Sequence, residues 1–182
     1  MKIFMVRHGQ TASNVAKRMM GNRIDDPLND EGRRQAQELA ENIKDMQFDV
    51  IFSSPLKRAH QTAEIIAKNW NMPIMQRDEL MERDFGTLTG KTFAEGDALT
   101  GGRRSRVEPL PEDEEYERAW GRETSEKFQK RLRHFTDEIK EKYSDKKVLV
   151  VAHSGVIKMA HFLFKDSTVD HVKNASIEEF EI

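Results

Sequence analysis

The chain has 182 residues, enough for one domain with a sizeable buried core, and its 30 Lys and Arg nearly balance 32 Asp and Glu. The resulting net charge of -2 argues against a nucleic acid or an anionic membrane as partner. The absence of cysteine excludes disulfides, zinc thiolates and thiol catalysis, and no apolar run approaches the roughly 20 residues that span a bilayer. We expect a soluble, cytoplasmic chain that forms one domain over residues 1–182.

Short apolar runs alternate with helical patterns along the chain. KIFMV (2–6), DVIFS (49–53) and KVLVV (147–151) are apolar nearly throughout, which is typical of parallel strands covered on both faces. Residues 176–182 read as an edge strand. These runs predict the strands of a mostly parallel sheet.

Apolar residues recur at helical spacing between the predicted strands. They are Ala36, Leu39, Ala40 and Ile43 in one segment, and Phe128, Leu132, Phe135 and Ile139 in another. A further helix is predicted after the second strand, with Ser54 as its cap and Pro55 in its first turn. Strands alternating with helices predict an α/β fold, in which helices flank both faces of a mostly parallel central sheet as three layers.

Residues 86–122 interrupt this alternation. The segment is rich in glycine at its start, then basic at Arg103, Arg104 and Arg106, then acidic over 112–117. A solvated surface insertion is one interpretation, and a lid with mixed helix over a site is the other. We favour the lid.

Cationic and imidazole side chains follow three of the predicted strands. Arg7 and His8 follow the first, Arg58 lies one helical turn beyond the second, and His153 follows the third. Ligands of open α/β sheets bind beyond the carboxyl ends of the strands, and the helix starts that follow favour an anion. The sequence therefore predicts a phosphate pocket at this edge. The other histidines have no such partners and are interpreted as structural: His60, His134, His161 and His171.

Four blocks of sequence resemble motifs of the histidine phosphatase superfamily, in the branch that contains cofactor-dependent phosphoglycerate mutase and small phosphatases. The blocks are VRHGQTASN (6–14), FSSPLKRAHQTAEII (52–66), LMERDFGTLTG (80–90) and VVAHSGVI (150–157). They occur in family order and span nearly the whole chain. The resemblance implies a phosphoglycerate mutase-like fold and a phosphomonoesterase that acts through a phosphohistidine on a small phosphorylated metabolite.

The resemblance also assigns roles to individual residues. Spacing does not say which histidine attacks; the family pattern implies His8 as nucleophile, held through its other N–H by a backbone carbonyl. Gly9 would leave room for close backbone approach beside it. Arg7 and Arg58 would grip the phosphoryl oxygens as planar forks, and His153 would donate to one of those oxygens.

The acid and the remaining contacts come from the same motifs. Among Glu79, Glu82 and Asp84, the family pattern places the proton-donating carboxyl at Glu82. Asn14 matches a residue that contacts the phosphoryl group, although a plain polar position early in a helix explains it equally well. Gly21 and Ser154 complete the expected phosphate-binding set. No metal and no cofactor are expected.

Some features leave alternatives open. Ser154 stands where the family often has glycine, and Leu88-Thr89-Gly90 replaces a commoner aromatic–acid–glycine step. The short chain and Gln10-Thr11 after the signature resemble phosphatases, while the arginine cluster within 103–106 would suit the second anion site of a mutase. A phospho-ligand binding module without catalysis is the other alternative. A zinc or iron site of His8, Glu82 and His153 is disfavoured by the flanking arginines. The oligomeric state stays open.

Overall fold

The structure, a computed structural model, describes residues 1–105, 107–108 and 111–182. Its central feature is a sheet of five strands in the order β3-β2-β4-β1-β5. The strands are β1 (Lys2–Arg7), β2 (Val50–Ser53), β3 (Ile74–Gln76), β4 (Val148–Ala152) and β5 (Ile177–Glu181). Neighbouring strands run parallel except β5, which pairs antiparallel with β1 at the edge. The predicted mostly parallel sheet and its C-terminal edge strand are confirmed.

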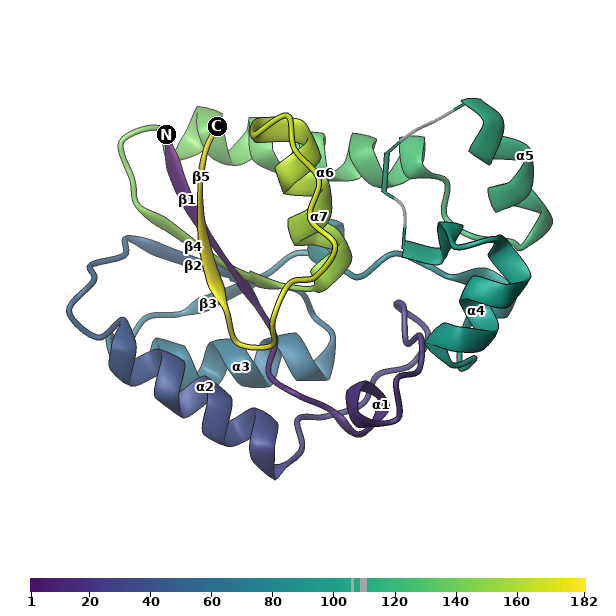
Figure 1. The fold of residues 1–182 in the computed structure, drawn as a ribbon. Helices are drawn as coiled ribbons and strands as arrows, with labels where there is room; N and C mark the ends of the chain where they lie inside the picture. The colour runs from purple at the N-terminus through teal and green to yellow at the C-terminus, as the bar shows by residue number, and fades with distance from the viewer. Residues whose placement is uncertain (106, 109–110) are drawn as a thin grey trace.

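Helices cover both faces of this sheet (Figure 1). One face packs against α2 (Asp30–Asn42) and α3 (Lys57–Ala67), and the other against α6 (Ser125–Lys142) and α7 (Ser154–Phe164). Alternate residues of each strand serve the two cores: in β1, Ile3 and Met5 join the α6–α7 side, while Phe4 and Val6 join the α2–α3 side. The predicted three-layer α/β/α architecture is therefore confirmed.

Two local expectations differ from the structure. The strand β3 was not predicted, because its residues are partly or fully exposed and lack the continuous apolar run of the other parallel strands. The start predicted for α3 is wrong: the helix begins at Lys57, its N-cap Leu56 has no side-chain cap, and Pro55 precedes it. Ser54 is not the cap because it lies before that residue, where its Oγ is 2.8 Å from Nε2 of His153.

Short helices fill the described part of the 86–122 segment, which confirms its mixed helical content. They are the 3₁₀ turns η2 (Gly86–Leu88) and η3 (Arg103–Ser105) and the helices α4 (Phe93–Thr100) and α5 (Pro111–Ala119). Elsewhere the chain forms the short helix α1 (Ala12–Val15) and the 3₁₀ turn η1 (Asp78–Leu80). The helices α1 and α4 lie beyond the carboxyl end of β1 (Figure 1). Arg106, predicted as part of the basic cluster, lies outside the described residues.

Candidate active site

The ends of the parallel strands bring the two arginines and two histidines together. Arg7 pairs with Ala152 across β1 and β4, so His8 and His153 follow side by side, with ring centroids 5.2 Å apart. Arg58 reaches the same place from the first turn of α3. The four side chains are between 0% and 9% exposed. A cavity of about 250 Å³ opens here, and Arg7, His8 and Arg58 contribute to its wall.

A backbone contact fixes the chemistry of the His8 ring. Nδ1 of His8 lies 2.7 Å from the carbonyl oxygen of Gly9, which only accepts hydrogen bonds, so Nδ1 carries the proton in the neutral ring. Burial, together with the charges of Arg58 and Arg7, lowers the pKa of His8 well below its usual 6.5. The ring is therefore neutral at pH 7 and offers a free lone pair at Nε2.

Close packing of the backbone holds this contact in place. A Cβ on Gly9 would lie 2.4 Å from the carbonyl oxygen of Gly32, on the first turn of α2. Any larger residue at position 9 would push the turn away from α2. The close backbone approach predicted at Gly9 is therefore present.

The His153 ring packs beside His8 and does not line the cavity. Its Nε2 lies 2.8 Å from the hydroxyl of Ser54, and its Nδ1 is buried with no hydrogen-bond partner among the described residues. Burial and the charge of Arg58 lower the pKa of His153 well below 6.5. The partnership with Ser54 was not predicted, because it joins residues 99 positions apart.

Backbone carbonyls hold both guanidiniums. Arg58 donates from Nη1 to the carbonyl of Ile24 at 2.8 Å and from Nη2 to that of Gly21 at 2.7 Å, while Arg7 donates from Nη1 to Val172. In the described part of the chain neither arginine forms an ion pair with a carboxylate, and the Nε of each is buried without a partner. Burial lowers the pKa of Arg7 to about 10, so the group stays charged at neutral pH. The arrangement leaves positive charge available for an anion.

Of the three acids considered, only Glu82 lines the cavity. Its Oε1 accepts from the amide of Arg83 at 2.9 Å and its Oε2 from the amide of Gly155 at 3.0 Å. Asp84 instead pairs with Arg23, and Glu79 pairs with Arg77. The two backbone amides therefore hold the Glu82 carboxyl at the edge of the site.

Asn14, Gly21 and Ser154 also line the cavity. The Oδ1 of Asn14 accepts from the amide of Thr11 at 3.1 Å, within the capping box of α1. Gly21 adopts a φ of +57° and presents its carbonyl to Arg58. Asn14 therefore caps a helix and also lies in the cavity wall, and its contact with a phosphoryl group stays a prediction.

The outer wall contains cations that the motifs did not predict. These are Arg18, Arg83, Arg122 and Lys158. Arg104, from the predicted basic cluster, joins them, whereas Arg103 stacks 4.5 Å over the ring of Tyr116. His171, interpreted from sequence as structural, lines the wall as well. The position of Lys158 one helical turn after Ser154 was the available signal.

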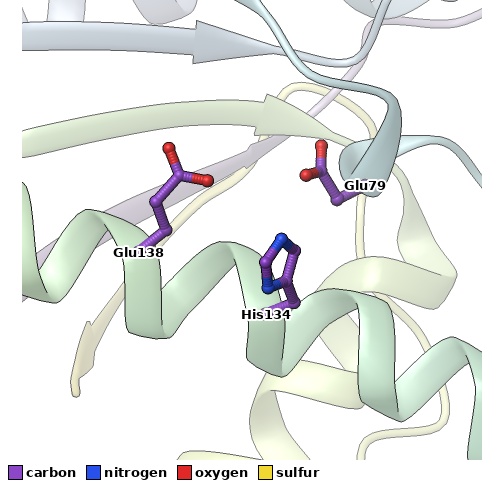
Figure 2. Close-up of side chains that lie close together, drawn as sticks. All are labelled: Glu79, His134 and Glu138. Atoms are coloured by element: carbon purple, nitrogen blue, oxygen red, sulfur yellow. The ribbon is translucent and has the colours of Figure 1, made fainter.

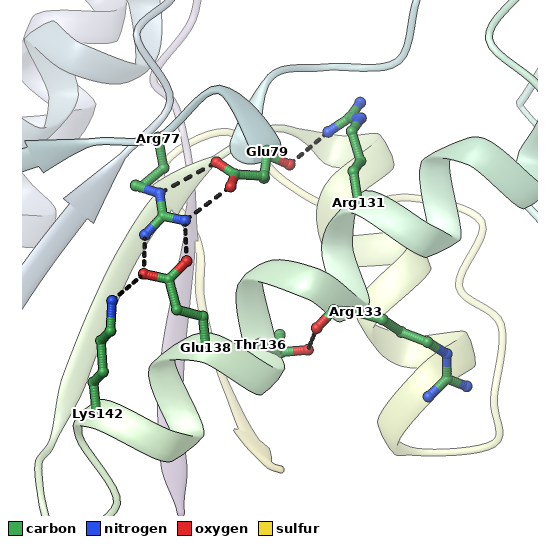
Figure 3. A network of polar contacts seen from close by, with 7 residues as sticks. All are labelled: Arg77, Glu79, Arg131, Arg133, Thr136, Glu138 and Lys142. Atoms are coloured by element: carbon green, nitrogen blue, oxygen red, sulfur yellow. Dashed lines mark hydrogen bonds and ion pairs between the residues drawn. The ribbon is translucent and has the colours of Figure 1, made fainter.

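A second cluster of candidate ligands lies between η1 and α6, outside the cavity wall. Figure 2 shows Glu79, His134 and Glu138, whose ligand atoms lie within 4.8 Å of one another. Arg77 already bridges the two carboxylates, at 2.8 Å from Glu79 and 2.6 Å from Glu138, and Lys142 adds a further contact (Figure 3). These cations supply the positive charge that a metal would bring, so the cluster acts as an ion-pair network between η1 and α6.

Within the described residues, His8, Glu82 and His153 do not form a comparable group of ligand atoms. This geometry removes the support for the alternative of a zinc or iron site at the three residues. None of the described helices has both the length and the apolar character that crossing a membrane requires.

Comparisons with known proteins agree with this geometry. The chain is 38% identical over 155 residues to the uncharacterized phosphatase PhoE of Bacillus subtilis, covering 85% of this chain and 72% of that protein. It is 31% identical over 179 residues to a metal-independent phosphoserine phosphatase of Arabidopsis thaliana, covering 97% and 74%. A mycobacterial glucosyl-3-phosphoglycerate phosphatase solved with VO3 superposes with a TM-score of 0.83 at 30% identity, over 98% and 91%. The profile of the histidine phosphatase superfamily (branch 1) matches residues 3–182, and the chain is an enzyme of that family.

Proposed function

We propose that the protein is a phosphatase that hydrolyses small phosphomonoesters through a phosphohistidine at His8. The observation that carries this proposal is the neutral His8 ring, with Nδ1 tied to Gly9 and Nε2 free, beside two guanidiniums that form no ion pair with a carboxylate in the described chain. A nucleophile and two cations in one buried cavity suit in-line transfer of a phosphoryl group.

The reaction follows from these positions in two steps. Arg7 and Arg58 hold the phosphoryl oxygens while Nε2 of His8 attacks phosphorus and the bond to the leaving oxygen breaks. Glu82 gives its proton to that oxygen. Water then attacks the phosphohistidine, Glu82 takes a proton from it, and cleavage of the P–N bond releases phosphate and restores His8. His153 packs beside the His8 ring outside the cavity wall, and donation from its buried Nδ1 to a phosphoryl oxygen stays a prediction.

The relatives support hydrolysis over isomerisation. The three proteins compared above are phosphatases by name, and the mycobacterial one was solved with VO3, a mimic of the phosphoryl group. Gln10-Thr11 after the signature points the same way. A phosphoglycerate mutase-like protein of Arabidopsis thaliana is 30% identical, and Arg104 lines the cavity, so a mutase is the second candidate.

The first prediction tests the nucleophile. Wild type, His8→Ala and His134→Ala are assayed in EDTA for phosphate release from p-nitrophenyl phosphate and from a panel of metabolite phosphates. We expect His8→Ala to lose about 10³-fold or more in kcat/KM, because the variant lacks the nucleophile that forms the phosphoryl-enzyme intermediate. His134 is exposed on α6 and outside the cavity, so His134→Ala controls for loss of any histidine.

The intermediate gives a second readout. Brief reaction with a labelled substrate is expected to label wild type, but not His8→Ala, with an acid-labile phosphoryl group. Retained activity in His8→Ala, or a phosphoryl group on another residue, would overturn the proposal. Isomerisation of phosphoglycerate faster than phosphate release would establish the mutase.

A further inference from the structure

The cavity wall carries more positive charge than a phosphoryl group needs. Its cationic side chains are Arg7, Arg18, Arg58, Arg83, Arg104, Arg122 and Lys158, and its carboxylates are Glu82 and Asp170. Two of the cations are neutralised from outside the wall: Arg83 pairs with Glu117, and Nε of Arg104 lies 2.8 Å from Asp97. The other five cations form no ion pair with a carboxylate in the described chain.

The net charge of the cavity wall indicates the charge of the ligand that would bind there. Five unpaired cations against two carboxylates leave a surplus of three positive charges. A phosphoryl dianion offsets two of them. At least one positive charge therefore remains for the organic part of the substrate, and more remains when Glu82 is protonated.

Lys158 is placed to use this remaining charge. Ser154, Gly155 and Lys158 all line the cavity, so one face of α7 forms its wall. Lys158 is half-buried, and it has no hydrogen-bond or ion-pair partner in the part of the chain that the structure describes. Burial lowers its pKa, because an ammonium with less hydration is less stable in its charged form. An anionic ligand would replace that hydration.

The neighbours of Lys158 place it on the side of the leaving group. The amide of Gly155 holds Glu82, the proposed acid for the leaving oxygen, and Glu82 is the strongest charge acting on Lys158. Arg104, Asp170 and Glu108 are also close enough to influence it. Among the described residues, Arg122 donates to the hydroxyl of Tyr116 and the carbonyl of Arg104 and pairs with no carboxylate, so it adds an uncompensated charge to the same outer wall.

A second cavity bounds this region. It has a volume of about 190 Å³ and shares Val107, Lys158 and Asp170 with the first. Lys158 therefore stands at the outer limit of the phosphoryl cavity. The ligand group that it meets must be within a few bonds of the phosphoester.

We infer that Lys158 is a specificity-determining residue that binds a second anionic group, a carboxylate or a second phosphoryl group, on the leaving side of the substrate. This inference rests on the proposed function and deepens it. The enzyme is then selective for small phosphorylated acids or bisphosphates over phosphates of neutral alcohols.

The experiment compares matched substrates that differ in one anionic group. Values of kcat/KM are measured for 3-phosphoglycerate against glycerol 3-phosphate, and for fructose 1,6-bisphosphate against fructose 6-phosphate. The variants are Lys158→Met, Lys158→Arg and Lys140→Met, the last being an exposed lysine of α6. Melting temperatures show that each variant is folded. The first pair tests whether a carboxylate is recognised, and the second pair tests whether a second phosphoryl group is recognised.

We expect wild type to prefer the charged member of at least one pair. Lys158→Met is expected to reduce that preference ratio by about 10- to 100-fold, as for loss of one charge-assisted hydrogen bond. Lys158→Arg should keep most of the preference, and Lys140→Met should match wild type. Equal turnover of both members by wild type, or an equal loss on both in Lys158→Met, would overturn the inference.

Failure of the proposed function would be recognised separately. In that case wild type would release no phosphate even from p-nitrophenyl phosphate. Calorimetric binding of the same matched ligands to wild type and Lys158→Met then decides the role of Lys158 without turnover. Selective weakening of the charged ligands in Lys158→Met supports the inference, and equal binding of charged and neutral ligands overturns it.

Discussion

At the residue scale, the site depends on contacts made by small residues to its reactive groups. Gly9 orients His8 through its carbonyl and packs against α2, and Gly155 orients Glu82 through its amide. Both glycines have ordinary backbone angles, so close approach is what requires them. The nucleophile and the acid are thus both oriented by backbone groups.

Gly155→Ala tests whether this close approach matters. The position is in α7, where alanine is normally favoured over glycine by about 1 kcal/mol. Here, however, the new Cβ would lie 2.2 Å from Oε1 of Glu82. We therefore expect Gly155→Ala to lower kcat/KM by about 10-fold or more for alkyl phosphates, which need the acid, and less for p-nitrophenyl phosphate.

A double-mutant cycle provides the control for this prediction. In a Glu82→Ala background the carboxylate is absent, so adding Gly155→Ala should cost little further activity. Additive losses in the cycle would show that Gly155 acts through something other than Glu82.

The site residues that directly follow a strand could be predicted from the sequence. Arg7, His8 and His153 follow β1 and β4 directly, so the parallel sheet alone brings them together. The contacts of Gly155 with Glu82 and of Ser54 with His153 were not predictable. They join distant segments through side-chain directions that depend on the packed fold.

At the element scale, a buried ion pair anchors the 86–122 segment beside the acid. Glu117 of α5 pairs with Arg83, the neighbour of Glu82, and accepts at 2.8 Å from both the amide and the hydroxyl of Ser125 at the start of α6. The sequence showed Glu117 only as part of an acidic run typical of a solvated surface. It is 4% exposed, because Arg83 and Ser125 supply partners that no local pattern indicates.

Glu117→Ala is expected to destabilise the fold by about 3–5 kcal/mol, because it removes one member of a buried charge pair and the partner of two Ser125 donors. Urea unfolding monitored by tryptophan fluorescence measures this change. Glu126→Ala removes a carboxylate that pairs with Lys130 at the surface of α6 and should cost less than about 1 kcal/mol. Similar costs for the two variants would contradict the anchoring role of Glu117.

At the scale of the whole molecule, the order of the strands explains why the site is positively charged. β1, β2 and β4 are neighbours and parallel, so their carboxyl ends deliver imidazoles and guanidiniums to one buried place. The apolar runs predicted these central strands well, since both faces of each strand are covered. The segment 86–122 was harder to predict, because its contacts are polar and join it to residues that are distant in the sequence.

Burying two neutral histidines in this place links stability to pH. The pKa values of His8 and His153 are lowered in the folded state, so below pH 6.5 the unfolded chain binds protons that the folded chain does not. Their contribution to stability is therefore complete above pH 6.5 and is lost as pH falls toward the folded-state pKa values. The slope is about 1.4 kcal/mol per pH unit for each histidine.

Unfolding free energies from urea titrations between pH 7.5 and 5 check this linkage. We expect the free energy of unfolding of wild type to fall below pH 6.5, and His8→Ala to remove about half of the slope that the two histidines contribute. Glu138 titrates in a separate window: Arg77 and Lys142 lower its pKa to about 2, so its contribution is lost only as pH falls from 4.5 toward 2. A flat free energy between pH 6.5 and 5 would mean that the imidazoles take up protons in the folded state, and His8 would then lack the neutral ring that phosphoryl transfer requires.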